Sequence, residues 1–129
     1  MLKWLPLVAR MVLGSIFLLA GLNGLFVIFG LEPFIDTSEE AMALFQFAYL
    51  LVTVKALEVI CGILLLMNRF VPLSLAALSP ITVNIFLLHV FLDHSLLPLA
   101  FLLILCQGYL LYIYRRNFFT LLEKKPLKL

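Results

Sequence analysis

The stretch LVTVKALEVICGILLLM, residues 51–67, is apolar at most positions and carries two opposite charges, Lys55 and Glu58, near its middle. A helix needs roughly 20 apolar residues to cross the ~30 Å hydrocarbon layer of a membrane. Extended back to residue 42, this run is long enough. Ionisable side chains are costly in hydrocarbon, so such residues usually face a partner or a cavity. The stretch therefore predicts a membrane-spanning helix with a polar inner face.

Three further runs of the same kind account for most of the remaining chain. We expect four spans, at about residues 7–29, 42–67, 71–92 and 96–114. Helix breakers stand between them, namely Glu32-Pro33, Asn68-Arg69 with Pro72, and Asp93-His94 with Pro98. The first run is too long for the apolar region of a signal peptide, so it is predicted to be a retained helix. The fold class predicted for residues 1–129 is all-α, as one polytopic four-helix bundle in the membrane.

The composition excludes several other classes of protein. Of the 129 residues, 65% are hydrophobic and 12% are charged, whereas soluble domains typically have about 45–50% and 25%. A domain this small keeps much of its surface in water and cannot hide such a surplus. Two cysteines and a net charge of +2 without a large basic block disfavour a disulfide scaffold and a nucleic-acid-binding domain. The expected partner is the lipid bilayer, and nucleic acid is not expected to bind.

The distribution of charge predicts the orientation in the membrane. Apart from Lys55, the Lys and Arg residues lie near the chain ends or in the second loop, at positions 3, 10, 69, 115, 116, 124, 125 and 128. The first and third loops contain no Lys or Arg and instead hold the acids Glu32, Asp36, Glu39, Glu40 and Asp93. Lys and Arg are enriched in cytoplasmic loops. Both termini are therefore expected to face the cytoplasm.

Polar side chains within the spans are the candidate functional residues. Lys55 and Glu58 are three residues apart, so they can pair on one face of a helix. At a rise of 1.5 Å per residue, Asn84 reaches about the depth of Lys55. Asn23 and His89 fall in the outer half, and Gln107 lies near the middle. These depths predict a polar core of Lys55, Glu58 and Asn84, which Asn23 and Gln107 could join.

Two interpretations of this core stay open. In the first, the polar groups only hold and orient the helices. In the second, they form a pocket that handles protons or binds a ligand headgroup, with Glu58 taking up a proton and His89 exchanging protons with the outer side. Such a pocket suits quinones, whose reduction requires protons at carbonyl oxygens.

The cysteines, glycines and outer histidines are interpreted structurally. Cys61 and Cys106 form no CxxC pair and are expected to be buried, inert thiols. Gly14 and Gly21 lie on one helix face, which favours close packing against another helix. His89 and Asp93 supply too few ligands for a metal ion, so no metal site is expected.

Several segments together resemble a known family. They read Ala9-Arg10, Gly14, Phe17 and Gly21-Leu22-Asn23-Gly24, then Lys55-x-x-Glu58-x-x-x-Gly62, then Pro80-Ile81-Thr82-Val83-Asn84-Ile85 and His89. Over nearly the whole chain this combination resembles the DoxX family of small four-helix membrane proteins. The family includes the small subunit of an archaeal thiosulfate:quinone oxidoreductase and membrane components of bacterial redox-defence assemblies. The resemblance carries over Arg10, Lys55, Glu58, Asn84 and His89, without a catalytic role for any of them.

The resemblance implies a membrane subunit of a quinone-linked oxidoreductase or redox-defence system, in the cytoplasmic (inner) membrane of a bacterium. Quinone is the one cofactor it suggests, and other membrane or redox proteins or a homo-oligomer are the suggested partners. The alternatives are a non-enzymatic assembly chaperone and a small transporter acting as an oligomer. No nucleotide, haem or flavin motif is recognisable, so an enzyme acting alone is not expected. The candidate ligand-binding or proton-handling residues are Lys55, Glu58, Asn84, His89, Arg10 and Asn23.

Overall fold

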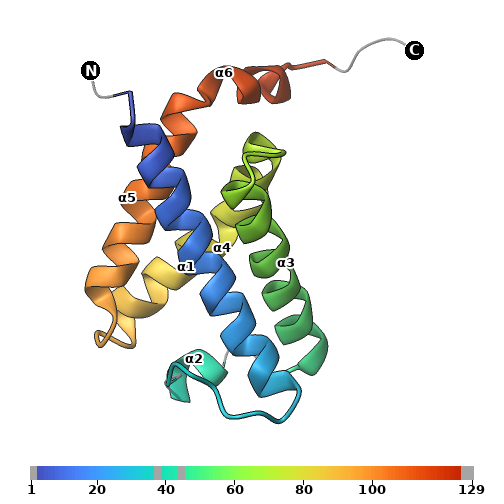
Figure 1. The fold of residues 1–129 in the computed structure, drawn as a ribbon, viewed down its shortest axis with the longest axis vertical. Helices are drawn as coiled ribbons and strands as arrows, with labels where there is room; N and C mark the ends of the chain where they lie inside the picture. The colour runs from blue at the N-terminus through green and yellow to red at the C-terminus, as the bar shows by residue number, and fades with distance from the viewer. Residues whose placement is uncertain (1–2, 37–38, 44–45, 126–129) are drawn as a thin grey trace.

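The computed structural model describes residues 3–36, 39–43 and 46–125, and this part of the chain is helical without strands. Figure 1 shows the arrangement. In chain order the elements are α1 (Leu5–Ile28), α2 (Glu39–Ala43), α3 (Ala48–Leu66), α4 (Val71–Phe91), α5 (Leu97–Ile113), α6 (Arg115–Phe118) and the 3₁₀ helix η1 (Phe119–Leu122). The predicted all-α class is confirmed.

Three helices, α1, α3 and α4, are long and apolar enough to cross a membrane. The 17-residue α5 makes a fourth span if it is counted with the segment Arg115–Leu122, which bends from it by 75°. The chain is therefore an integral membrane protein, with three to four candidate spans among the described helices. The second span begins later than expected, because α2 is a separate short helix and Phe47 before α3 has extended backbone. Apolar content alone does not reveal such a break.

Glycines bring α1 and α3 into close contact, as predicted. A Cβ atom at Gly62 would lie 2.8 Å from the backbone nitrogen of Leu18 and 2.9 Å from the carbonyl oxygen of Gly14. At Gly21 it would lie 2.6 Å from Cγ2 of Val59. Backbones this close leave no room for a side chain, which is the usual reason for small residues between membrane helices.

A tight turn separates α3 from α4. Asn68 has a left-handed backbone with a φ of 56°. The amide of Asn68 donates to the carbonyl of Leu65 at 3.3 Å, and that of Arg69 donates to Leu64 at 3.0 Å. This pair of bonds is the Schellman arrangement that ends many helices. After the turn α4 diverges from α3 and crosses behind α1 to pack along α5 (Figure 1).

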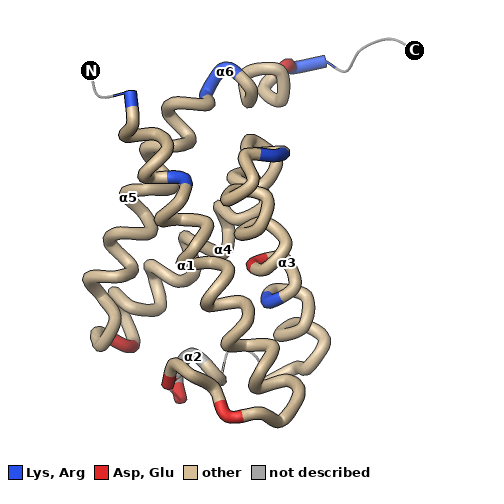
Figure 2. The backbone as a smooth tube through the Cα atoms, in the orientation of Figure 1, with Lys and Arg blue, Asp and Glu red and all other residues tan. Residues whose placement is uncertain are grey.

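Charged residues separate along the molecule (Figure 2). Lys and Arg gather at the end that holds both described chain ends and the α3–α4 turn, whereas acids gather at the opposite end. There are two exceptions among the described residues. Glu123 lies beside the basic residues that follow η1, and a pair of opposite charges, Lys55 with Glu58, lies about half-way along α3. No other Lys, Arg, Asp or Glu of the described residues lies at this level of the bundle.

Candidate functional site

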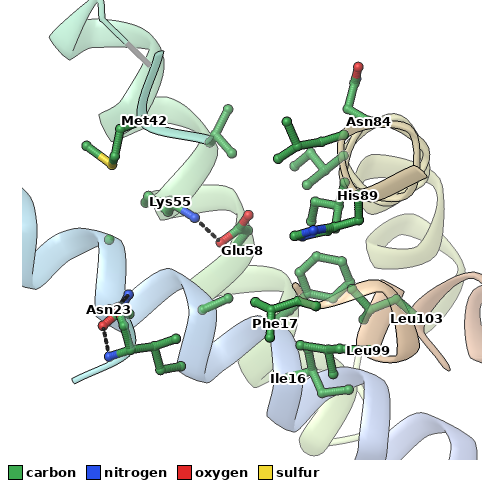
Figure 3. Close-up of a pocket in the computed structure, with 18 of the residues that line it drawn as sticks. Ile16, Phe17, Asn23, Met42, Lys55, Glu58, Asn84, His89, Leu99 and Leu103 are labelled. Atoms are coloured by element: carbon green, nitrogen blue, oxygen red, sulfur yellow. Dashed lines mark hydrogen bonds and ion pairs between the residues drawn. The ribbon is translucent and has the colours of Figure 1, made fainter. Parts of the chain in front are cut away.

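The predicted ion pair forms on the inner side of α3. The ammonium Nζ of Lys55 lies 3.1 Å from Oε2 of Glu58 (Figure 3). The side chain of Lys55 is 17% exposed and that of Glu58 only 2%. The aliphatic stem of Lys55 lies against Gly24 of α1, where a Cβ atom would overlap it. Two helices thus position this pair, α3 by spacing and α1 by the absence of a side chain.

The pair lies on the wall of a pocket of about 690 Å³ between α1, α3, α4 and α5. This volume is within the range of sites for small molecules. Most of the wall is apolar and includes Leu51 as well as Phe17 and Leu103, which are labelled in Figure 3. Polar residues on the wall include all the predicted candidates except Arg10, namely Asn23, Lys55, Glu58, Asn84 and His89.

Glu58 has one carboxylate oxygen available to a ligand. Among the described residues only Lys55 bonds to this carboxylate, through Oε2. The other oxygen belongs to a side chain that lines the pocket. An ionised carboxylate accepts several hydrogen bonds, so a ligand that carries a donor can complete the set.

His89 enters the same pocket from the far end of α4. Its Nδ1 lies 2.8 Å from the backbone carbonyl oxygen of Asp93 and 4.0 Å from the carboxylate Oδ2 of that residue. A carbonyl only accepts, so this bond assigns the proton to Nδ1. In the neutral ring Nε2 is then an acceptor. Figure 3 shows the ring extending from α4 toward Glu58.

Asn23 and Asn84 also line the pocket, but neither contacts the ion pair by a hydrogen bond. The amide of Asn23 donates to the carbonyl of Ile35 at 3.0 Å and accepts from its N–H at 2.9 Å. It holds the loop after α1 against the pocket. Asn84 is exposed and donates to the carbonyl of Pro80 on its own helix at 2.9 Å, and Figure 3 shows it pointing away from the pair. Asn84 therefore does not join Lys55 and Glu58 in a polar core, contrary to the prediction.

Gln107 belongs to a different cluster between α4 and α5. Its Nε2 donates to the carbonyl of Leu75 at 2.8 Å and to Oγ of Ser79 at 3.1 Å, and its Oε1 accepts from Thr82 at 3.3 Å. The side chain of Gln107 is buried there. The depth predicted from the sequence put Gln107 near Lys55, but the side chain of Gln107 leaves α5 on the face that packs against α4.

Arg10 lies outside the pocket and binds the end of α3. Its guanidinium donates to the carbonyl of Leu65 and, at 3.3 Å, to that of Leu66. These are carbonyls of the last turn of α3, where a cation stabilises the helix dipole. The structure therefore separates Arg10 from the other candidates.

Two structural features bear on metal and thiol chemistry. Within residues 3–36, 39–43 and 46–125 no group of three or more His, Cys, Asp or Glu side chains could hold a metal ion. Cys61 and Cys106 are free thiols, the first buried and the second half-buried. The apolar pocket walls, such as Phe17 and Leu103, are not recognisable from the sequence, because apolar residues occur on every face of these spans.

Comparison with known proteins gives one match. The family model DoxX matches residues 5–90, a range that includes Arg10, Asn23, Lys55, Glu58, Asn84 and His89 but not Gln107. No match was found among curated proteins or among solved structures.

Proposed function

Since the chain belongs to the DoxX family, we propose that it is a membrane subunit of a quinone-linked oxidoreductase or redox-defence system that binds the quinone headgroup. One observation carries the proposal, namely the buried Lys55–Glu58 pair on the wall of the 690 Å³ apolar pocket. Intramembrane ionisable residues commonly mark substrate or proton pathways.

The residues of the pocket fit such a ligand. A quinone has a flat ring with two carbonyl oxygens. When bound, it supplies the capacity to carry two electrons and two protons. The ammonium of Lys55 can donate to a carbonyl oxygen, whereas the neutral Nε2 of His89 can accept from a hydroxyl. Apolar walls such as Phe17 and Leu103 suit the ring.

Glu58 and His89 are proposed to handle the protons. A general acid or base has to lie within hydrogen-bond reach of the group it serves. Glu58 is buried beside Lys55, whereas His89 is joined to Asp93 near the end of α4. Protons would enter from that end, and a redox partner protein would exchange the electrons.

We also propose that both termini face the cytoplasm and that the protein resides in a bacterial inner membrane. The support is the gathering of Lys and Arg at one end of the bundle (Figure 2), the end that is cytoplasmic in most membrane proteins. His89 and Asp93 then lie toward the outer side.

The test is whether the protein carries quinone. Protein purified in native lipid is extracted, and quinone per chain is measured by mass spectrometry for the wild type, Lys55→Met and Glu58→Gln. Lys3→Met and Glu32→Gln make the same chemical changes at exposed positions and serve as controls. We expect quinone in the wild type and the controls. Either pocket variant is expected to bind a short-chain quinone about tenfold more weakly. This loss of affinity corresponds to one lost hydrogen bond to a charged group.

Two results would contradict the proposal. Equal quinone binding by all five proteins would rule out this site. A wild type without quinone that holds one stoichiometric membrane protein instead would favour the assembly chaperone.

A further inference from the structure

One face of α4 is exposed along its whole length. It consists of Leu73, Ala76, Pro80, Asn84, Leu87 and Phe91, all classed as exposed, and is named here the α4 seam. Successive members are three or four residues apart, so they lie in one row along the helix. Leu73 is 64% exposed and Phe91 is 73% exposed. The described helices pack against the other sides of α4.

Asn84 is out of place on such a face. It lies three residues from the middle of α4, which is about 4.5 Å along the helix axis at 1.5 Å per residue, and so lies within the hydrocarbon. Its Nδ2 donates to Pro80, but among the described residues no donor reaches its Oδ1. An unpaired polar group in lipid carries a large desolvation cost.

A second acceptor lies on the same seam. Pro80 has no N–H, so the carbonyl of Ala76 loses its partner within the helix. Ala76 is exposed one turn before Pro80. The seam thus combines one small residue, Ala76, which permits close approach, with polar groups that need a partner helix.

We propose that the α4 seam is a homodimer interface, in which the amide of Asn84 pairs with the same residue of a second copy. The second N–H of Nδ2, which Pro80 does not use, would donate to Oδ1 of the other copy, and the reverse bond would form by symmetry. An amide is both donor and acceptor and is therefore complementary to itself across a two-fold axis. One Asn in an apolar seam is also a known way to fix the register of two helices.

This inference is independent of the quinone proposal. Asn84 also lies on the wall of the pocket, so ligand binding is not a suitable readout. Oligomeric state in a bilayer is suitable, because it responds to the seam whether or not the pocket binds a quinone.

The first experiment measures dimerisation of the full chain in lipid vesicles by Förster transfer between labelled copies over a range of protein-to-lipid ratios. Asn84→Leu is expected to weaken the dimer by about 3- to 20-fold, the range that interhelical polar contacts span in bilayers. Asn84→Gln keeps an amide and is expected to retain most of the affinity. Since Asn84 is exposed, neither change affects the packing within one copy.

The second experiment locates the interface. In a Cys61→Ala, Cys106→Ala background, Leu87→Cys on the seam and Leu102→Cys on α5 are each treated with a short bis-maleimide. Leu87 and Leu102 are both 42% exposed, so accessibility is matched. We expect cross-linked dimers from Leu87→Cys only, and fewer of them when Asn84→Leu is added.

Three results would overturn the proposal. They are a chain that is monomeric at all protein-to-lipid ratios, a dimer that Asn84→Leu leaves unchanged, and equal cross-linking at the two positions. A different protein cross-linked to Leu87→Cys in native membranes, without homodimer, would assign the seam to that protein and would equally overturn the homodimer.

Discussion

The aliphatic stem of Lys55 lies against Gly24 of α1, so closely that a Cβ atom at residue 24 would overlap three of its carbons. This contact links the two most intimately packed helices to the only ion pair in the middle of the described bundle. The glycine thus shapes the position of a charge as well as the helix contact.

Gly24→Ala is therefore expected to displace the Lys55 side chain. The stem of a lysine is flexible, so the helices can stay together while the ammonium moves away from its place in the pocket. We expect a loss of about three- to tenfold in affinity for a short-chain quinone, which is the value of roughly one neutral hydrogen bond, with little change in unfolding temperature. Titration of the purified variant measures the affinity.

Gly108→Ala is the matched control for that change. Gly108 also lies in a membrane helix, and a Cβ atom there would meet nothing within 4 Å. Its quinone affinity should equal that of the wild type. If Gly24→Ala binds as tightly as Gly108→Ala, the contact with Lys55 does not position the ammonium for a ligand.

Gly62→Ala should affect stability instead. Its Cβ atom would meet the backbone of Leu18 and Gly14, and a backbone cannot move aside as a lysine stem can. Overpacking of this kind typically costs about 1–3 kcal/mol. The expected result is a lower unfolding temperature in detergent than for Gly108→Ala, and an unchanged temperature would show that α1 and α3 can separate at little cost.

The contrast between Glu58 and Asn84 shows how far the sequence predicts this site. Lys55 and Glu58 are three residues apart on one helix, so local geometry alone predicts their pairing. Asn84 is at the right depth, but depth does not determine rotation about the axis, and α4 turns this residue away from the pair (Figure 3).

Contacts between distant segments likewise cannot be predicted from the local sequence pattern. The bonds of Asn23 to Ile35 and of Gln107 to Leu75 depend on how a loop and two helices are placed in three dimensions. Apolar runs predict that spans exist and roughly where they end. They contain little information on which faces meet, because lipid-facing and buried positions are similarly apolar in a membrane protein.

Arg10→Met should lower stability without changing the pocket. The variant loses the guanidinium bonds to the last carbonyls of α3, and hydrogen bonds to charged groups typically contribute about 1.5–3 kcal/mol. Chemical unfolding in mixed micelles measures the loss, and Arg10→Lys should recover part of it. Arg69 is exposed, so Arg69→Met serves as the control and should behave as the wild type. A reduced quinone affinity with unchanged stability would instead return Arg10 to the ligand site.

Removing one partner of the buried ion pair should cost more than removing both. Lys55→Met leaves the carboxylate of Glu58 buried and without its only described hydrogen-bond donor. Isolating a buried charge in this way typically costs about 3–5 kcal/mol, whereas replacement of the whole pair is often nearly neutral. The double variant Lys55→Met, Glu58→Gln should therefore be more stable than Lys55→Met alone, by at least about 2 kcal/mol in reversible unfolding. If the two single changes simply add in the double variant, Lys55 and Glu58 do not stabilise one another, and the pair is held in place by the surrounding helices instead.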